Sequence, residues 1–583
     1  MKKIFCDILK KYKVSISITV LFIAINMYVL TLPSKIIGVI IDLLYNLEQN
    51  KPQIITYTYY LLGTLILAML ARLPWRYLVG YVPRSIEKDL KNKLFSHFTR
   101  IKLHDIQKIK NGEIMAYFVQ DIREIRSAIY RIISYGSRII FTAIIVGYTM
   151  ASGVNFKLTI ATLFPILITA YLIVVIKKYV ERSFEKSQRY FTNLSEYVQE
   201  STDAIRTTKS YSQEYYQLKG FIKKNKKLRA SNNAVDIHST LLATCINIGF
   251  GLCYGISLIY GSELVLNGQI TVGDFVAFNG YIQLFVGPVS WIPSVISRFK
   301  RTQISYRRLD KFFSLEKEKI DVKSKKLIEE LNGDIVIKNL NFNYPESLDM
   351  VLEDINLEVK KGQTLGIIGT IGSGKTTLLN ILVGLYPVKR GKIFIDGKDI
   401  NDIPIPVLRE NISFITQDNF LFSTTLKENV NLFKDVYDKF FINDSVRNAM
   451  IYDEIKHMPK ELDTTIGGSE GVELSGGQKQ RLAISRAFLK RSNIVFLDDT
   501  FSALDNRTEK AVLNNIQELT NEKTCIIVSN RISDIKNSDE IIVMDEGRIV
   551  ERGTHESLIN EKNMYYSFYI QQSSKEKDGD INE

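Results

Sequence analysis

Long apolar runs occupy the first half of the chain, and short apolar segments separated by polar stretches occupy the second half. A helix that crosses a bilayer needs about 20 largely apolar residues. Six segments meet that requirement: Val14–Leu44, Pro52–Ala71 with an extension toward Tyr81, Ile139–Phe156, Leu158–Ile176, Ile237–Ser262 and Phe275–Ser297. The pattern therefore predicts an all-α membrane domain of six helices.

Two long connections, at about Arg84–Arg138 and Lys177–Asp236, join the second predicted helix to the third and the fourth to the fifth. Both are basic, have a helical pattern and lack a stretch rich in helix breakers. We therefore expect the second to fifth helices to continue well past the bilayer. The connections on the other side are short and carry few cations. Because cations favour the cytoplasmic side of a membrane, this asymmetry predicts that both chain termini are cytoplasmic.

Acidic and lysine side chains are nearly absent from the six apolar segments. The exceptions, Lys35 and Asp42, fall in the outer part of the first segment, within reach of an interface or a watery cavity. No set of such groups lines up at mid-span. Ionisable groups in lipid are costly and are kept for function, so their absence argues against a buried proton or ion relay.

From about Leu331 the sequence has the pattern of an α/β domain, with short apolar strands and helical segments between several of them. The predicted strands are Asp334–Leu340, Gln363–Ile368, Ile393–Asp396, Ile494–Leu497, Cys525–Val528 and Glu540–Met544. We therefore expect a membrane domain at residues 1–310, a charged linker at 311–331, an α/β domain at 332–571 and a disordered tail at 572–583.

The composition changes this picture little. A net charge of +13 would suggest a nucleic-acid partner in a soluble chain. Here the cations concentrate between the apolar runs, which favours cytoplasmic loops and argues against nucleic-acid binding. The cysteines show no spacing typical of a disulfide or a metal site. Low alanine content with abundant Lys, Ile and Asn is typical of an AT-rich bacterial genome.

The segment Gly369–Thr376, GTIGSGKT, follows a predicted strand and opens a helix, which is the context of a phosphate-binding loop. Its backbone N–H groups and the helix N-terminus favour phosphate oxygens. We expect Lys375 to reach the β- and γ-phosphates of ATP, and Thr376 and the strand-end carboxylate Asp498 to bind Mg²⁺. The residues predicted to contact the nucleotide here are Gly369, Thr370, Gly372, Ser373, Gly374, Lys375, Thr376 and Thr377.

The segment Leu474–Gln478, LSGGQ, has the pattern of a helix start that Ser475 caps. With this segment and the phosphate loop, the chain resembles the ATP-binding cassette exporters over nearly all its length. In that family the LSGGQ signature covers the ATP of the opposite subunit. The resemblance therefore implies a dimer with two composite ATP sites, in which Ser475, Gly477 and Gln478 contact the nucleotide of the partner.

Further stretches match the same family. Tyr344 stands where an aromatic ring stacks on adenine, and Gln417 where a glutamine senses Mg²⁺ and the attacking water. Ser502–Asp505 matches a loop that touches the partner subunit. Two coupling regions and the surface that receives them are implied at Gly112–Asp121, Ala204–Tyr211 and Phe420–Ser423.

Two positions depart from the family pattern. Asp499 stands where the family has a glutamate base, and Asn530 where it has a switch histidine. The shorter Asp499 side chain retracts the carboxylate by roughly 1–1.5 Å, whereas a general base needs contact at about 2.6–3.2 Å. Such a shift can cost on the order of 100-fold in rate. Asn530 can hydrogen-bond a phosphate but cannot carry positive charge.

These departures predict a site on this chain that binds ATP and hydrolyses it slowly. We expect an ATP-driven half-transporter for an amphipathic or hydrophobic substrate, in a heterodimer in preference to a homodimer. The alternatives are an ATP-binding regulatory subunit without turnover of its own, and a lipid or peptide exporter acting as a homodimer. The six predicted spans exclude a soluble cassette ATPase. The sequence leaves drug, lipid and peptide substrates open.

Overall fold

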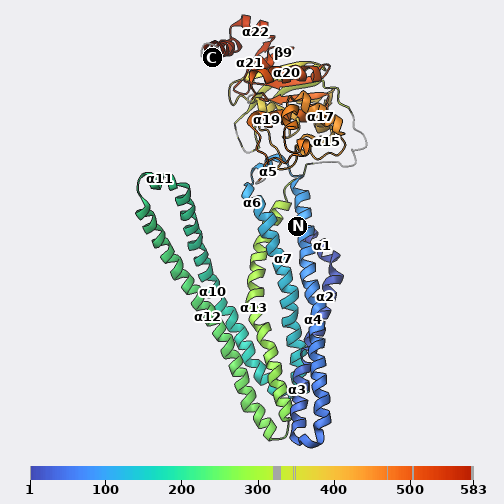
Figure 1. The fold of residues 1–583 in the computed structure, drawn as a ribbon, viewed down its shortest axis with the longest axis vertical. Coiled ribbons are helices and arrows are strands. Elements are labelled where there is room, and N and C mark those ends of the chain that lie inside the picture. Colours follow the sequence, from blue (N-terminus) through green and yellow to red (C-terminus); the bar gives the residue numbers. More distant parts are fainter. Residues whose placement is uncertain are drawn as a thin grey trace. The chain divides into compact units, whose positions relative to one another are not determined.

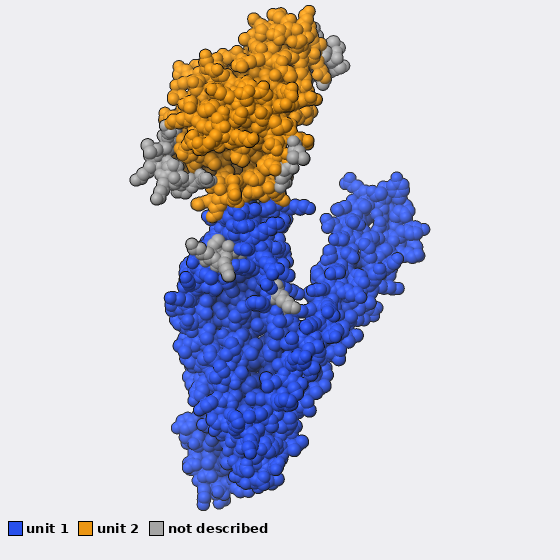
Figure 2. Space-filling model, turned by 180° about the vertical axis from the view of Figure 1, so that it is seen from behind, with its two compact units in different colours: residues 1–99, 109–315 blue, residues 100–108, 316–583 orange. Residues whose placement is uncertain are grey.

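The computed structural model describes residues 2–318, 330–345, 347, 349–468, 471–501 and 504–579. The chain divides into two compact units (Figure 2). The first comprises Met1–Thr99 and Ile109–Leu315, and the second comprises Arg100–Lys108 and Glu316–Glu583. Most of the predicted linker at 311–331 lies outside the described residues.

Six helical stretches among the described residues are long and apolar enough to cross a membrane, as predicted. They are Lys13–Asn46, Glu48–Phe98, Asn111–Gly153, Phe156–Asp203, Glu214–Leu266 and Val272–Phe313. A short helix, α1 (Lys2–Lys11), precedes them. The predicted extension beyond the bilayer is confirmed, because α4 (Leu47–Phe98), α10 (Phe156–Asp203) and α12 (Glu214–Leu266) have 52, 48 and 53 residues.

The third stretch begins well before its apolar segment, as the helical pattern of the preceding connection predicted. It consists of short α-helices joined by π-helical turns: α6 (Asn111–Ala116), η2 (Tyr117–Asp121), α7 (Ile122–Arg131), η3 (Ile132–Gly136), α8 (Ser137–Phe141), η4 (Thr142–Val146) and α9 (Gly147–Gly153). Arg138 therefore lies inside this stretch. Its guanidinium carbon is 4.4 Å from the ring centroid of Trp291 and 5.6 Å from that of Trp75, so cation–π contacts stabilise the buried part of this cation.

Helices α3 (Leu32–Leu43) and α13 (Val272–Phe313) approach each other closely at their outer ends. A Cβ atom on Gly273 would lie 2.0 Å from the carbonyl oxygen of Gly38, so only glycine fits there. The Asp42 carboxylate accepts hydrogen bonds from Gly273 N at 2.7 Å and from Thr271 Oγ1 at 2.6 Å. Asp42 thus satisfies donors at the N-terminus of α13, where an anion is favoured.

Helices α10 and α12 pack along each other and are joined by the short helix α11 (Ile205–Ser210). They leave the other helices of this unit as they approach α11 (Figure 1). A groove of about 650 Å³ between them is mainly apolar. Its polar members include Thr169, Thr244 and His238, and His238 Nδ1 lies 3.1 Å from Ser183 Oγ.

The second unit contains a six-stranded sheet in the order β10-β9-β3-β8-β7-β6, in which the five strands from β9 to β6 are parallel and β10 is antiparallel. The bounds are β3 (Thr364–Gly369), β6 (Ile412–Ile415), β7 (Ile494–Asp498), β8 (Thr524–Val528), β9 (Glu540–Asp545) and β10 (Arg548–Gly553). A smaller antiparallel sheet, β2-β1-β4-β5, is formed by β1 (Ile335–Phe342), β2 (Leu352–Val359), β4 (Ile393–Ile395) and β5 (Lys398–Asp399). The predicted α/β domain is confirmed.

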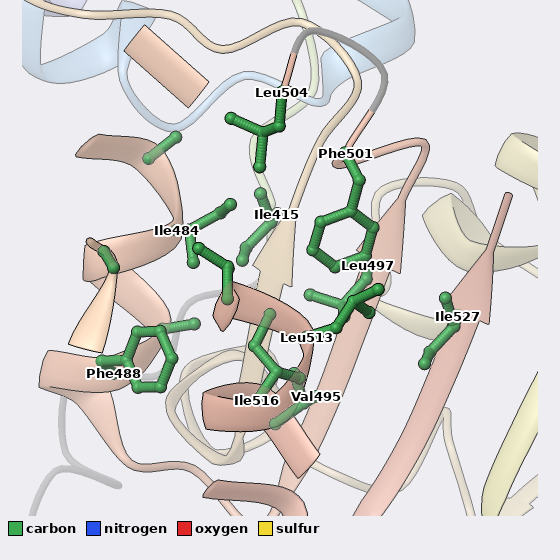
Figure 3. Packing of buried hydrophobic residues seen from close by; sticks show 14 of the residues in the cluster. Ile415, Ile484, Phe488, Val495, Leu497, Phe501, Leu504, Leu513, Ile516 and Ile527 are labelled. Carbon is green, nitrogen blue, oxygen red and sulfur yellow. The ribbon is translucent and has the colours of Figure 1, made fainter. Parts of the chain in front are cut away.

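Two hydrophobic clusters cover the two faces of the parallel sheet. Alternate residues of β7 belong to different clusters, Ile494 and Phe496 to one, Val495 and Leu497 to the other, because successive side chains of a strand point to opposite faces. One face packs against α14 (Lys375–Leu382) and the antiparallel sheet. Figure 3 shows the other face, packed against α19 (Gly476–Lys490) and α20 (Asn506–Thr520). Strand-end residues are thereby held rigidly.

The remaining helices of this unit are short and surround the sheets. They are α15 (Ile405–Asn411), α16 (Leu426–Asn431), α17 (Lys439–Asn448), α18 (Tyr452–Lys456), α21 (Ile532–Ile535), α22 (His555–Glu561) and α23 (Met564–Gly579). The sequence predicted a disordered tail from Gln572, whereas α23 continues to Gly579. Tyr565, fully buried, anchors α23 on the core, and Gln572 itself makes two hydrogen bonds.

The segment Arg100–Lys108 belongs to the second unit although it precedes the third span. Its helix α5 (Leu103–Gln107) packs through Leu103 against the core of the nucleotide domain, and Gln107 Oε1 accepts a hydrogen bond of 3.0 Å from Tyr386. The predicted coupling region Gly112–Asp121 lies instead in the first unit.

Candidate ATP-binding site

The phosphate loop lies where β3 ends and α14 begins. Gly374 adopts a φ of +94° at the N-cap of α14 and Gly372 a φ of +86°, conformations that favour glycine. A Cβ atom on Gly369 would lie 2.0 Å from the Met544 carbonyl oxygen. The loop therefore depends on its glycines to bring backbone N–H groups toward an anion at a helix N-terminus.

Lys375 and Thr370 are held by the loop and its neighbouring strand. The Lys375 ammonium donates to the carbonyl oxygens of Gly369 at 2.9 Å and Thr370 at 2.8 Å, and lies 3.4 Å from Ser373 Oγ. Burial lowers the pKa of Lys375, an effect that the charges of Asp498 and Asp499 oppose. Thr370 Oγ1 donates to Asp545 at 2.7 Å. The cation is thus placed beside the predicted phosphate position.

Thr376 and Asp498 come together as predicted. Thr376 Oγ1 donates to Asp498 Oδ1 at 3.1 Å. The other carboxylate oxygen, Asp498 Oδ2, is buried and lacks a hydrogen-bond partner within the part of the chain that the structure describes. Burial raises the pKa of Asp498. A hydroxyl beside a buried carboxylate oxygen with unused acceptor capacity is a donor set that suits Mg²⁺.

Gln417 and Asp499 also come together. Gln417 Nε2 donates to Asp499 Oδ2 at 3.3 Å. Asp499 has a φ of +46°, and its N–H donates to the Val528 carbonyl oxygen at 2.8 Å. This bond attaches the Asp499 backbone to β8 and so fixes where its side chain starts.

Tyr344 lies beside the start of α14. Its hydroxyl is 2.8 Å from Thr377 Oγ1, and its ring meets that of Tyr386 edge to face at a centroid distance of 5.2 Å. Thr377 is buried and uses its hydroxyl on Tyr344. Thr377 is thus bonded to Tyr344 in this structure, and its contact with the nucleotide stays a prediction.

Asn530 follows β8 and has an exposed side chain. The adjoining Ser529 is buried, and its hydroxyl donates to Asp534 at 2.5 Å. Burial raises the pKa values of Asp534 and of Glu509, which pairs with Arg531 at 2.5 Å. Sequence reasoning missed this acidic network and Gln572, because each depends on tertiary contacts.

The signature forms the start of α19. Ser475 and Gln478 make the reciprocal hydrogen bonds of a capping box, 3.2 Å and 2.8 Å long. Gln478 Nε2 also donates to Glu454 at 2.6 Å, and Arg481 pairs with the same carboxylate at 2.6 Å. Ser475 is exposed and Gly477 half-exposed. These bonds hold the helix start without using residues 369–377.

Of the loop predicted to touch a partner, Ser502 and Ala503 lie outside the described residues. Asp505 accepts a hydrogen bond of 3.0 Å from Thr508 N and caps α20.

A phosphate loop at the carboxyl edge of a parallel sheet, an LSGGQ helix and six spanning helices define a membrane transporter driven by ATP. Residues 352–502 match the family described as ABC transporter, and residues 16–289 match the ABC transporter transmembrane region. The chain belongs to the ABC transporters. It is an ATP-hydrolysing translocase with the architecture of an exporter half-transporter.

Relatives of known name agree with this assignment. The chain is 34% identical to YheI of Bacillus subtilis, a probable multidrug resistance ABC transporter ATP-binding/permease protein, over 84% of this chain and 83% of that protein. It is 27% identical to an ATP-dependent lipid A-core flippase of Photobacterium profundum over 95% of this chain and 94% of that protein. The solved structure of a bacterial Atm1-family ABC exporter with ATP bound has the same fold, with a TM-score of 0.79 and 22% sequence identity. The match covers 97% of this chain and 99% of that chain.

Proposed function

We propose that this chain is one half of a heterodimeric exporter and that its own ATP site is degenerate. The observation that carries the proposal is Asp499. Its backbone is fixed to β8 by the bond to Val528, so the chain cannot move forward to offset the shorter side chain. The Gln417 amide meets it only at 3.3 Å. A carboxylate retracted by about 1 Å is a poor base for water.

Asn530 supports the same reading. An amide can accept or donate a hydrogen bond to a phosphate, but it cannot become a cation that stabilises developing charge. The carboxylates nearest to this segment, Asp534 and Glu509, are occupied by Ser529 and Arg531. They do not supply the missing function at the exposed Asn530 position.

In the proposed site Tyr344 packs against adenine, the phosphate loop binds the phosphates, and Lys375 leaves its carbonyl partners for the β- and γ-phosphates. Thr376, Asp498 and Gln417 would hold Mg²⁺, which supplies charge neutralisation at the phosphates. The exposed start of α19, with Ser475, Gly477 and Gln478, covers the ATP of the partner subunit. ATP binding then closes the dimer and shifts the population of the membrane domain.

For the substrate we propose an amphipathic or hydrophobic compound. The spans carry no mid-membrane acidic relay, and the groove between α10 and α12 is mainly apolar, with a few hydroxyl and imidazole groups. The names of the relatives, multidrug resistance protein and lipid flippase, point to the same chemical class. Because the nucleotide domain must reach cellular ATP, both termini are proposed to be cytoplasmic, in the membrane of a bacterial cell.

The test is the ATP turnover of the purified full-length chain in lipid, measured alongside ATP binding. We expect ATP to bind with turnover near zero until a partner with a glutamate base is added. Brisk turnover of the chain alone, stimulated by drug or lipid, would show a working homodimer with Asp499 as the base. Binding without turnover even in a competent heterodimer would support the regulatory subunit.

A further inference from the structure

The C-terminal helix α23 reaches the segment that carries Asn530. Gln572, the first residue of the predicted tail, lies on this helix, and its side-chain amide faces residues 530–532. Gln572 Nε2 donates to the carbonyl oxygen of Asn530 at 2.9 Å. Gln572 Oε1 accepts from the N–H of Ile532, also at 2.9 Å. One amide therefore holds the backbone on both sides of Arg531.

These bonds use groups that the local backbone leaves free. Ile532 N is at the first position of α21, whose N-terminal N–H groups have no partner within the helix. The Gln572 amide offers one acceptor and one donor in the same plane, like the edge of a neighbouring strand. The geometry is thus that of a two-point backbone clamp.

The clamp has a firm base. Tyr565 on the first turn of α23 is fully buried, and its hydroxyl lies 2.6 Å from His555 Nδ1. The N–H groups of Met564 and Tyr565 donate to the Glu551 carboxylate at 2.5 Å and 3.1 Å. Because the helix start is fixed to α22 and β10, the position of Gln572 two turns later is defined.

The other side of the segment is held by the sheet. Ser529 N donates to the carbonyl oxygen of Ile367 in β3 at 3.1 Å, and Arg531 N donates to Ser529 Oγ at 3.0 Å. Backbone groups of residues 529–532 are therefore bonded to β3 on one side and to α23 on the other. The Asn530 side chain is exposed to solvent.

We propose that Gln572 is a positioning residue that sets the Asn530 side chain for contact with the γ-phosphate of ATP. The proposal rests on the proposed site, in which Asn530 faces that phosphate. In this proposal the C-terminal helix α23 helps to position a residue of the ATP site. Any event that lifts α23 from the domain then weakens the response to ATP without altering the phosphate loop.

The nucleotide itself provides a selective readout. ADP lacks the γ-phosphate and so makes no use of Asn530, whereas the phosphate loop and Tyr344 contact both nucleotides. Each hydrogen bond is worth about a fivefold change in an equilibrium. Loss of the clamp is expected to cost the single hydrogen bond between Asn530 and the γ-phosphate, so that ATP affinity falls about fivefold and ADP affinity is unchanged.

The test uses the full-length chain in lipid with the substitution Gln572→Met, which keeps the length of the side chain and removes both polar atoms. The control is Ser567→Ala on the exposed face of the same helix, where the hydroxyl bonds to Asn563 O. Binding of ATP and ADP, the thermal midpoint and hydrogen exchange at Ile532 N–H are measured for both variants. We expect faster exchange and weaker ATP binding in Gln572→Met only, with the thermal midpoint showing that the variant remains folded.

Equal losses of ATP and ADP affinity would reduce Gln572 to a structural residue and overturn the proposal. Unchanged exchange at Ile532 would do the same. None of these readouts requires turnover. Brisk ATP hydrolysis by the chain alone would therefore refute the degenerate site while leaving the clamp intact, so the two failures are distinguishable.

Discussion

At the scale of single residues, the proposed ATP site brings together the residues expected to bind the nucleotide and the two residues proposed to slow its hydrolysis. Lys375, Thr376 and Asp498 are bonded to one another or to the loop in an arrangement ready for nucleotide. Asp499 and Asn530 lie at the ends of adjacent strands, β7 and β8. In the proposed degenerate site, these two side chains account for the slow turnover.

The first prediction concerns this pair. The double substitution Asp499→Glu with Asn530→His is expected to raise the ATP turnover of the assembled transporter. At this chain's own site, the rate of hydrolysis is expected to rise by up to about 100-fold. The longer carboxylate reaches the water position and the imidazole supplies a titratable donor. Steady-state phosphate release measures the effect. Turnover that stays at the wild-type rate would show that neither residue limits the reaction.

The motif residues were predictable because each acts within a short stretch of chain. The loop needs glycines at fixed positions beside a strand and a helix, so its spacing alone identified it. The contacts of Thr377 and Gln572 were not predictable, because each joins residues far apart in sequence. The Thr377 hydroxyl contacts the hydroxyl of Tyr344, and the Gln572 amide oxygen accepts from Ile532 N, partners 33 and 40 positions away in sequence.

At the scale of elements, the contact between α3 and α13 depends on two glycines and one carboxylate. Substituting Gly273→Ala places a methyl group against the Gly38 carbonyl and the Asp42 carboxylate. Overpacking of this kind costs about 1–3 kcal/mol. We expect a lowered thermal midpoint in lipid. The matched control is Gly255→Ala on α12, where a Cβ meets no atom within 4 Å; an equal loss there would contradict the argument.

A second prediction at this scale concerns α5. The bond between Gln107 and Tyr386 joins the segment before the third span to a ring that packs on Tyr344. Gln107→Ala is expected to lower the amount of substrate moved per ATP hydrolysed, because this link between the adenine side and the chain leading to the span is lost. Transport and hydrolysis are measured on the same vesicles.

Tyr386→Phe removes the same hydrogen bond from the other side and keeps the ring. The double variant is expected to behave like either single one, since residues that share one bond are not additive. Additive effects would mean that the bond does not carry the coupling.

The spans were predictable from apolar length, but their beginnings were not. The third begins at Asn111 because an amphipathic helix continues from the apolar segment into polar sequence. Its charged positions, Arg138 among them, look like loop residues until Trp75 and Trp291 are seen to pack on the guanidinium. These contacts join residues on different helices, so the local sequence composition does not predict them.

At the scale of the whole molecule, the proposed half-transporter contributes to two different ATP sites, one with its phosphate loop and the other with its LSGGQ segment. The start of α19 is well formed, capped and exposed, which is what a partner's nucleotide would need. We predict that Gly477→Asp abolishes turnover of the heterodimer while this chain alone binds ATP as before. An acidic residue in the first turn suits the helix dipole but repels phosphate.

The measurements are ATP binding by the isolated chain and hydrolysis by the pair. A loss of binding in the isolated chain would indicate misfolding of α19. Hydrolysis unaffected by the substitution would place the active composite site elsewhere.

The length of α12 has a mechanical consequence. Its 53 residues span roughly 80 Å at about 1.5 Å per residue, well over twice the thickness of a hydrocarbon core. A rotation of about 5° at the outer end would sweep the tip at α11 through roughly 7 Å, more than one helical pitch. The hairpin of α10 and α12 thus acts as a lever arm. A small rotation at one end displaces the other end far enough to break contacts there and form new ones.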